Sequence, residues 1–461
     1  MKKFNREKSL RKIEFKRKWR SYSRYVYIVV PCVLCCLLCL YFAYSKFFVS
    51  EEQAVIRTTV GAYIDGEYSS TIPGRNDRYI VEKVSCDNGS SGKWDYGNWG
   101  LLTTNFSKST KCNVYFKKPV SNIDYIIAQL DTSGKCPTMN ADGSVNVTGV
   151  EATNSYLCKA KDAYGDSYYY RGNVTNNYVK FADKYWRIVR INGDGTVRVI
   201  YDGTSAHANG ESSRDRQIGT SVFNSSYNDN AYVGYMYGKI GALTYAAAHA
   251  NTNDSTIKAY IDNWYKTNIV GTTNEQYLAD NVFCNDRSIS SNKPTSNYNN
   301  LGYGTNVTAY RWYYGPWESG GYNSSMRLMC PQKNDAFTVS DITNGNGALT
   351  YPVGLLSADE IVLAGGWNAA NSGYYLYSGQ YWWASSPFDF NGNYARVRSI
   401  GSSGYANYSD YVNNNNGVRP VFNLKAEALK YGDGTASNPY RLTESLDNSS
   451  SSESGGIDTG D

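Results

Sequence analysis

The chain has 461 residues, of which 19% are charged, 41% hydrophobic and 15% aromatic, a ring content that argues against disorder. Residues 1–24 hold 11 Lys and Arg against 2 Glu, whereas residues 25–461 carry 35 basic and 39 acidic residues. A basic tip on a mildly acidic body excludes a nucleic-acid-binding protein, and only 2 His exclude His-based metal chemistry along the chain.

Residues 25–48 form a nearly uninterrupted apolar stretch, long enough to cross ~30 Å of hydrocarbon as a helix. Tyrosines flank it as in aromatic belts, and the basic residues 1–24 precede it. This pattern predicts a basic cytoplasmic tail over 1–24, a single transmembrane helix over 25–48, and an extracellular remainder of a cell-membrane protein. The alternative, a cleaved signal peptide, is disfavoured because Lys46 and Phe47 stand where small residues would mark the cleavage site.

Six cysteines follow the apolar stretch: Cys86, Cys112, Cys136, Cys158, Cys284 and Cys330. An even number in a segment predicted to be extracellular indicates three disulfides. Pairing between neighbours is favoured because each pair then encloses one coherent segment, although sequence alone leaves every connectivity open. Reduced thiols are the alternative, and zinc is disfavoured because no C-x-x-C spacing or clustered His accompanies these residues.

Residues 49–118 are predicted to form a stalk and a small β module, because strand-like runs alternate with polar turns and Cys86 and Cys112 can pin them together. A disulfide-stapled connector is predicted over 119–164, with a short helix at 121–130 that begins at Ser121. At the other end, residues 444–461 are polar and are predicted to be a disordered tail.

The main domain is predicted over 165–443. Its strongest signal is a β-hairpin, in which two alternating apolar runs flank the turn at 192–195. The run of Asp254, Ser255 and Thr256 is expected to cap a helix with apolar residues at helical spacing, and Ser357 and Glu360 form a capping box for a second, short helix. Short strands are then expected at these ranges: 374–377, 381–386, 393–400 and 417–426.

Two stretches resemble a domain family of unknown function on surface proteins of Gram-positive gut bacteria: GDSYYYRGNVTNNYVKFADKYWRIVRINGDGTVRVIYDG (165–203) and YWWASSP…GVRPVFNL (381–424). FCNDRSI (283–289), LLSADEIVLAGG (355–366) and GDGTASNPYRL (432–442) fit it too. The resemblance implies a C-type-lectin-like, formylglycine-generating-enzyme-like fold and no known activity. The predicted fold class is α+β: a single transmembrane helix, a small β module, then a C-type-lectin-like mixed domain with long loops.

Departures from these folds limit the chemistry. Formylglycine-generating enzymes work through late cysteines, and no Cys follows Cys330. Calcium-dependent lectins use a W-N-D sequence, whereas here Trp367 and Asn368 precede an alanine. Both His207 and His249 are interpreted as structural or solvated. We therefore predict no enzymatic activity, no metal and no cofactor.

Two motifs of the domain are expected to be structural. Glu360 is explained by the capping box rather than by acid–base chemistry with Asp359. The aromatic residues Tyr381, Trp382 and Trp383 are expected in the core, and Arg419 is expected to form a buried ion pair or to cap carbonyls.

The stretch 366–416 is rich in Tyr, Asn, Ser and Gly, a mixture that binding loops favour. Aromatic rings with side-chain amides also suit a sugar, which offers CH faces and hydroxyls. A biased composition of the whole chain, which has 44 Tyr, is the competing explanation. The candidate ligand-binding residues are Trp367, Asn368, Tyr374, Tyr375, Tyr394, Tyr405, Asn407, Tyr408, Asp410 and Tyr411.

These observations predict a membrane-anchored surface protein for binding or adhesion. Its expected partners are the membrane and an extracellular glycan or protein, and not nucleic acid. One alternative is an envelope structural protein without a diffusible ligand. Another is the variable ligand-binding protein of a diversity-generating retroelement, whose mutagenesis scatters Asn, Tyr, Ser and Asp codons near the end of such a domain.

Overall fold

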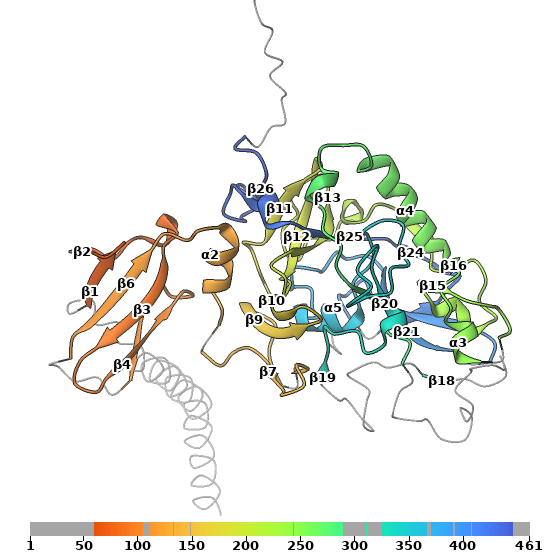
Figure 1. Ribbon diagram of the computed structural model, residues 1–461, viewed down its shortest axis with the longest axis horizontal. Coiled ribbons are helices and arrows are strands. Elements are labelled where there is room, and N and C mark those ends of the chain that lie inside the picture. Colours follow the sequence, from red (N-terminus) through yellow and green to blue (C-terminus); the bar gives the residue numbers. More distant parts are fainter. Residues whose placement is uncertain are drawn as a thin grey trace, which may run out of the picture. The chain divides into compact units, whose positions relative to one another are not determined.

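The computed structural model describes the following residues: 60–104, 110–131, 133–147, 149–242, 244–288, 310–311, 325–366, 370–390, 392–406 and 408–445. The chain divides into two compact units, residues 1–118 and 119–461, and each is treated by itself (Figure 1).

The first unit contains a four-stranded sheet of order β2-β1-β6-β3 and a β4-β5 hairpin. Its strands are β1 (Val60–Ile64), β2 (Glu67–Ser69), β3 (Ile80–Cys86), β4 (Ser91–Asp95), β5 (Gly100–Thr104) and β6 (Cys112–Lys117), with a 3-10 turn, η1 (Arg75–Asp77). Alternation along the strands turns one side chain in two inward, so that Ala62, Trp94, Val114 and Phe116 form a small core. The β1 and β6 strands are parallel, while β3 and β6 are antiparallel.

The second unit is built around two larger sheets. The first has the order β25-β13-β12-β10-β9, with β11 pairing β12 and β26. Its strands are β9 (Ser155–Asp162), β10 (Gly165–Gly172), β11 (Tyr178–Phe181), β12 (Lys184–Ile191), β13 (Val197–Gly203), β25 (Val421–Leu424) and β26 (Tyr440–Arg441). The predicted hairpin is confirmed as β12 and β13, and Gly195 takes the positive φ of 83° that its turn requires.

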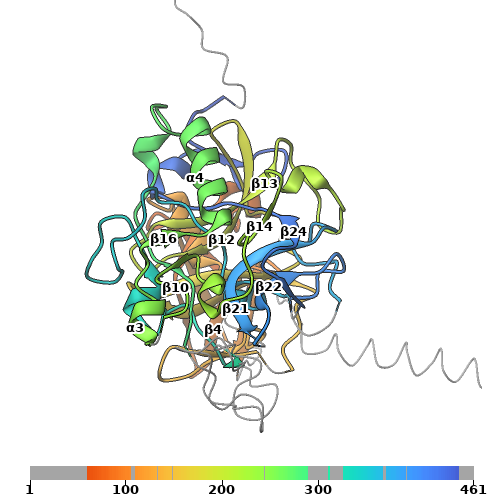
Figure 2. The same cartoon turned by 90° about the vertical axis from the view of Figure 1, so that its right-hand side faces the viewer.

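The second large sheet has the order β14-β24-β21-β22-β23, with β18 beside β21. Its strands are β14 (Thr220–Val222), β18 (Tyr310–Arg311), β21 (Trp382–Phe390), β22 (Ala395–Ile400), β23 (Tyr408–Tyr411) and β24 (Asn415–Gly417). Figure 2 shows β21 and β22 as a long curved pair, in blue. The predicted strand at 374–377 is wrong: this segment forms bends and a turn.

Short strand pairs and helices complete the second unit. The strand pairs are β7 (Thr138–Met139) and β19 (Ser325–Met326) with β8 (Val145–Asn146), β15 (Met236–Tyr237) with β16 (Asn253–Asp254), and β17 (Phe283–Cys284) with β20 (Ala336–Phe337). The helices are α2 (Asn122–Ala128), α3 (Tyr245–Ala248), α4 (Thr256–Asn268) and α5 (Ala358–Ala364). The 3-10 turns are η2 (Arg214–Arg216), η3 (Asn230–Val233), η4 (Glu275–Tyr277), η6 (Lys333–Asp335) and η7 (Ala426–Leu429).

The predicted helix starts are confirmed. Ser121, Ser255 and Ser357 each accept a backbone N–H of the first turn, and Ser357 and Glu360 form the complete capping box. Helix α5 contacts β10 of one large sheet and β21 of the other, so it joins the two layers of the core (Figure 1).

All three disulfides join neighbouring cysteines, as predicted: Cys86 with Cys112, Cys136 with Cys158, and Cys284 with Cys330. The first lies in the first unit, where its two cysteines face each other directly across β3 and β6.

The predicted α+β class is wrong. The described residues form a mainly β protein with few helices, because most apolar residues alternate along short strands and the helical patterns are brief.

The predicted transmembrane helix over 25–48 lies outside the described residues. Within those that are described, no helix is both long and apolar enough to cross a membrane. The longest of them, α4, has 13 residues, or ~20 Å of helix against ~30 Å of hydrocarbon. The structure therefore does not support a single-pass membrane protein, and that part of the predicted fold and localisation is withdrawn.

Candidate binding face of the second unit

Three tyrosines from three separate segments meet beside the second large sheet. Tyr227 lies in the loop after β14, Tyr394 immediately precedes β22, and Tyr411 ends β23. Backbone hydrogen bonds bring these segments together: the N–H of Ala395 donates to the carbonyl of Tyr227 (2.7 Å), and the N–H of Val412 donates to that of Ala395 (3.1 Å). Because Ala395 and Val412 are fully buried, they hold the adjacent tyrosines at the surface.

The three rings, called here the tyrosine cluster, touch one another in sequence. Tyr227 and Tyr394 stack with their centroids 5.2 Å apart and their planes inclined by 20°, and Tyr411 lies 4.9 Å from Tyr394 at 59°. Their exposed fractions are 37%, 40% and 39%. Rings that are both packed and exposed offer amphipathic contact area at little cost in conformational entropy.

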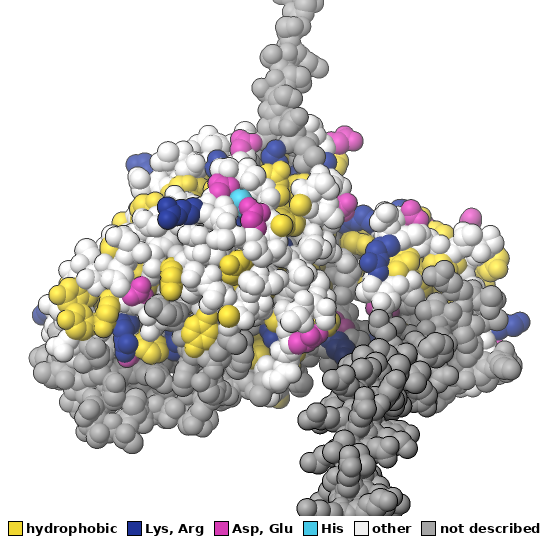
Figure 3. Space-filling model, turned by 180° about the vertical axis from the view of Figure 1, so that it is seen from behind, with side chains coloured by type: hydrophobic (Ala, Val, Ile, Leu, Met, Phe, Trp, Pro, Cys, Tyr) yellow, Lys and Arg dark blue, Asp and Glu magenta, His cyan; other side chains and the backbone are white. Residues whose placement is uncertain are grey.

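The surroundings of the tyrosine cluster combine exposed amides with paired charges, because the register places Arg396 opposite Tyr411. Asn228, Asn393 and Asn413 are exposed and lie within two residues of a ring. The nearest ion pair along β22 joins Arg396 to Asp389, whose carboxylate is buried. On the face of the molecule seen in Figure 3, charged side chains are scattered among hydrophobic side chains and the white atoms of the backbone and of the other side chains.

Asp410 organises the turn beside the cluster. Its carboxylate accepts the N–H of Tyr411 and the side-chain amides of Asn414 and Asn416. This carboxylate therefore shapes the β23–β24 turn that presents Tyr411, rather than standing free for a ligand.

The other predicted binding residues are distributed differently. Tyr374 and Tyr375 are completely buried, and burial raises the pKa of both hydroxyls. Tyr405 is half-buried, and its carbonyl accepts the N–H of Gly401 in the turn between β22 and β23. Trp367, Asn368, Asn407 and the side chain of Tyr408 lie outside the described residues. Sequence analysis missed Tyr227, which no local motif connects with the stretch 366–416.

The structural roles expected for three motif residues are confirmed, but the expectation for Tyr381 is wrong, because its side chain is 41% exposed. Trp382 and Trp383 are buried in the core. Arg419 pairs with Asp202 at 3.0 Å and donates to the carbonyls of Tyr201 and Leu376. Burial lowers the pKa of Arg419 to about 9, against the opposing effect of Asp202.

His207 is also structural. Its ring nitrogens lie 2.7 Å from Glu211 Oε1 and 2.9 Å from Asp215 Oδ2, and Tyr178 donates to its carbonyl. Gly203 makes this possible, because a Cβ there would lie 2.8 Å from His207 Nε2. The contacts of His207 with Glu211 and Asp215 therefore fix the loop that follows β13.

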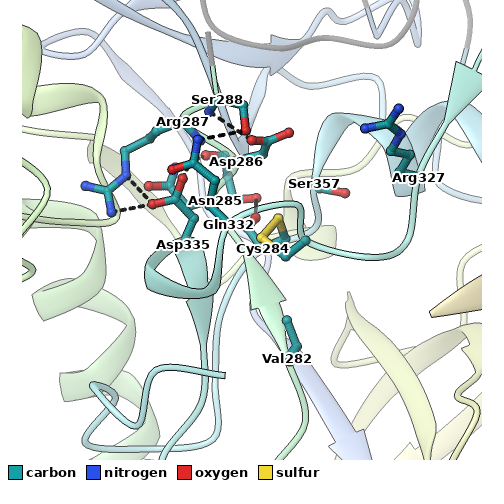
Figure 4. The surroundings of a disulfide bond; sticks show 12 residues. Val282, Cys284, Asn285, Asp286, Arg287, Ser288, Arg327, Gln332, Asp335 and Ser357 are labelled. Carbon is teal, nitrogen blue, oxygen red and sulfur yellow. Dashed lines mark hydrogen bonds and ion pairs between the residues drawn. A yellow bond between two sulfur atoms is a disulfide. The ribbon is translucent and has the colours of Figure 1, made fainter. Parts of the chain in front are cut away.

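The surroundings of the Cys284–Cys330 disulfide hold several buried ionisable groups (Figure 4). Asp335 binds Arg287 through two carboxylate oxygens and is fully buried. Burial raises the pKa of Asp286 and of Asp359 to about 7, although Asp286 accepts hydrogen bonds from Ser288. Such carboxyls exchange protons near neutral pH.

His249, the second histidine, is buried beside Tyr245, and burial followed by the charge of Arg287 lowers its pKa to about 2. It therefore stays neutral in the folded protein. Across the described residues, no group of His, Cys, Asp or Glu is arranged to hold a metal ion.

A sequence family described as a domain of unknown function (DUF6273) matches residues 324–426. This range contains Tyr394 and Tyr411 but not Tyr227. It agrees with the resemblance to an uncharacterised domain family over part of the predicted span. No curated protein and no solved structure matches the chain. The C-type-lectin-like fold and the Gram-positive gut origin are therefore not confirmed.

Proposed function

We propose that the protein is a binding protein whose second unit recognises an extracellular glycan or protein through the tyrosine cluster, with a glycan as the favoured ligand. The observation that carries the proposal is the contact of three exposed rings from three separate segments. Buried neighbours hold these segments in place, so the rings are preorganised, which lowers the entropic cost of binding.

The neighbourhood of the rings favours a glycan. A sugar presents CH faces, which pack on aromatic rings, and hydroxyls, which exchange hydrogen bonds with amides. Exposed asparagines lie beside each ring of the cluster, while the nearby Arg396 is already paired. Both kinds of contact are thus available without the desolvation of an unpaired charge.

The disulfides support a site of action in an oxidising environment. Cross-links of this kind form and persist outside reducing compartments. All three enclose segments of the described units, and none joins one unit to the other.

Binding of the intact oxidised chain to a broad array of glycans and host-surface proteins tests the proposal. We expect Tyr394→Ala, which removes the central ring, to weaken glycan binding by about tenfold or more, as for a hot-spot residue. The matched control is Tyr381→Ala, because Tyr381 is 41% exposed, immediately precedes β21, and lies outside the cluster.

Three outcomes distinguish the alternatives. Equal losses for Tyr394→Ala and Tyr381→Ala, with melting unchanged, would place the site elsewhere and overturn the proposal. Binding to proteins alone, lost in Tyr394→Ala, would favour the protein ligand. Silence of the folded chain across the array would favour a structural role.

A further inference from the structure

A second exposed aromatic surface lies in the first unit, on the outer face of its four-stranded sheet. Strand register places four side chains in one line: Tyr68 of β2 opposes Tyr63 of β1, Tyr63 is paired with Tyr115 of β6, and Tyr115 opposes Lys83 of β3. We call this line the tyrosine row. It runs across all four strands.

The side chains of the tyrosine row contact one another along its length. Tyr63 and Tyr115 stack with centroids 4.7 Å apart and planes inclined by 14°, and Tyr68 meets Tyr63 edge-on at 5.7 Å. Lys83 Nζ lies 4.4 Å from the centroid of the Tyr115 ring. Stacking at about the spacing of adjacent strands means that the rings stand side by side on the sheet.

The tyrosine row faces away from the core of the first unit. The core residues Ala62 and Val114 alternate with Tyr63 and Tyr115 along the same strands and point to the opposite face. Tyr68 is 68% exposed and Lys83 is exposed, while Tyr63 and Tyr115 are half-buried.

The charge of this face is positive at the row. The exposed carboxylate on the same strand, Glu82, pairs with Lys117 at 3.3 Å. In the described part of the chain, Lys83 forms no ion pair and its ammonium lies against a ring instead. One ammonium therefore stands beside Tyr115 at the end of the row and is available to an anion.

We propose that the tyrosine row binds an anionic polysaccharide. The tyrosine rings contact the CH groups of the sugar units, and the phenol hydroxyls donate hydrogen bonds to sugar oxygens. Lys83 pairs with a carboxylate or sulfate of the polysaccharide. The steps of the row, from strand to strand, are about 4.8 Å, comparable with the length of a sugar unit. A repeating acidic chain can therefore meet successive side chains. This site lies in a different unit from the tyrosine cluster and does not depend on it.

Binding of the full oxidised chain to three soluble polymers tests this proposal: polygalacturonate, uncharged dextran and polyglutamate. We expect binding to polygalacturonate that weakens as salt is raised, and much weaker binding to the other two. Lys83→Gln and Tyr68→Ala, which alter exposed side chains, should each weaken the polygalacturonate affinity by about fivefold to tenfold.

Lys118→Gln is the matched control. Lys118 also lies over a ring of the first unit, 4.1 Å from the centroid of Tyr79, but outside the tyrosine row, so its loss should leave affinity within about twofold. Equal losses for Lys83→Gln and Lys118→Gln would reveal unspecific charge attraction and overturn the proposal.

Two further results would also overturn it. Binding of polyglutamate as tight as that of polygalacturonate would indicate an acidic peptide partner, and no binding of polygalacturonate by the folded chain would remove the site. Tyr394→Ala separates this proposal from the proposed function, because that variant should bind polygalacturonate like the unaltered chain.

Discussion

The tyrosine row of the first unit and the tyrosine cluster of the second expose the same kind of ring on different supports. Register in a regular sheet aligns the row, whereas the cluster depends on backbone hydrogen bonds between a loop and two strand ends. The row ends at a lysine, whereas exposed asparagines lie within two residues of each ring of the cluster. Ring content alone therefore does not define a surface: the supporting backbone determines which rings meet, and the neighbouring side chains determine the charge beside them.

A substitution that destabilises the second unit alone should affect the tyrosine cluster and spare the tyrosine row. The carboxylate of Asp202 lies 2.7 Å from Arg216 and 3.0 Å from Arg419, all fully buried in the second unit. Asp202→Asn leaves these guanidiniums without their counter-charge, and we expect the second unit to lose about 3–5 kcal/mol of unfolding free energy. Denaturant unfolding measures this loss, and the first unit should keep its transition midpoint.

A control for this loss is Asp166→Asn, which breaks the solvent-exposed pair with Lys159 in the same unit. Exposed pairs contribute ~0–1 kcal/mol. A comparable loss in both variants would contradict the idea that buried charges hold the scaffold of the cluster.

The reverse experiment weakens the support of the row. Cys86 and Cys112 oppose each other directly across β3 and β6, so their disulfide fixes the register that aligns Lys83 with Tyr115. The double variant Cys86→Ala/Cys112→Ala should cost about 2–4 kcal/mol, measured on the unfolding transition of the first unit. Polygalacturonate binding should weaken with it, while binding at the cluster is retained. Parallel loss at both sites would show that the two supports are not independent.

Sequence reasoning succeeded where local patterns control structure. Ser121 and Ser357 are recognisable as helix caps because each stands at the start of a helical pattern, and the run 254–256 contains the third cap, Ser255. The β12–β13 hairpin follows from its Asn-Gly turn. Neighbouring cysteines also proved to be the pairs. These features depend on residues close together in the chain.

The candidate site was only partly predictable because it depends on distant segments. Tyr374 and Tyr375 have the same composition around them as Tyr394 and Tyr411, yet the first pair is buried and the second exposed. What separates them is the partner: Tyr375 packs against β10, where its N–H donates to Gly172. A long-range backbone hydrogen bond from Ala395 brings Tyr227 to the cluster, and no local sequence motif predicts this contact.

A smaller effect should appear in the pH dependence of the second unit. The pKa of Asp286 rises from 3.8 to about 7 on folding, mainly because of burial. The native state then binds more protons than the unfolded state between these two pH values. The contribution of protonated Asp286 to the unfolding free energy is therefore complete below pH 3.8 and is lost as pH rises through about 7.

Asp286→Asn removes the ionisation and keeps an oxygen that can accept from Ser288. The unfolding free energy of the unaltered chain should fall relative to that of the variant as pH rises. We therefore expect the stability advantage of the variant to grow by on the order of 2 kcal/mol from pH 5 to pH 8, measured by denaturant unfolding. Asp166→Asn should show no such gain. A stability advantage of the variant that is larger at pH 5 than at pH 8 would have the wrong sign and would contradict the raised pKa of Asp286.

The smallest expected effect is the coupling energy between stacked rings, which can be compared between the tyrosine row and the tyrosine cluster. Double-mutant cycles can compare the stacked pairs Tyr63–Tyr115 and Tyr227–Tyr394, each ring replaced by Leu to keep apolar volume. Coupling of about 0.5–1.5 kcal/mol is expected for both, in the unfolding free energy of the respective unit. Coupling in the row alone would mean that the loop segments do not hold Tyr227 against Tyr394 in solution. The cluster would then be assembled by its ligand, whereas the row would be a preformed surface, and affinity at the cluster would carry the cost of ordering its rings.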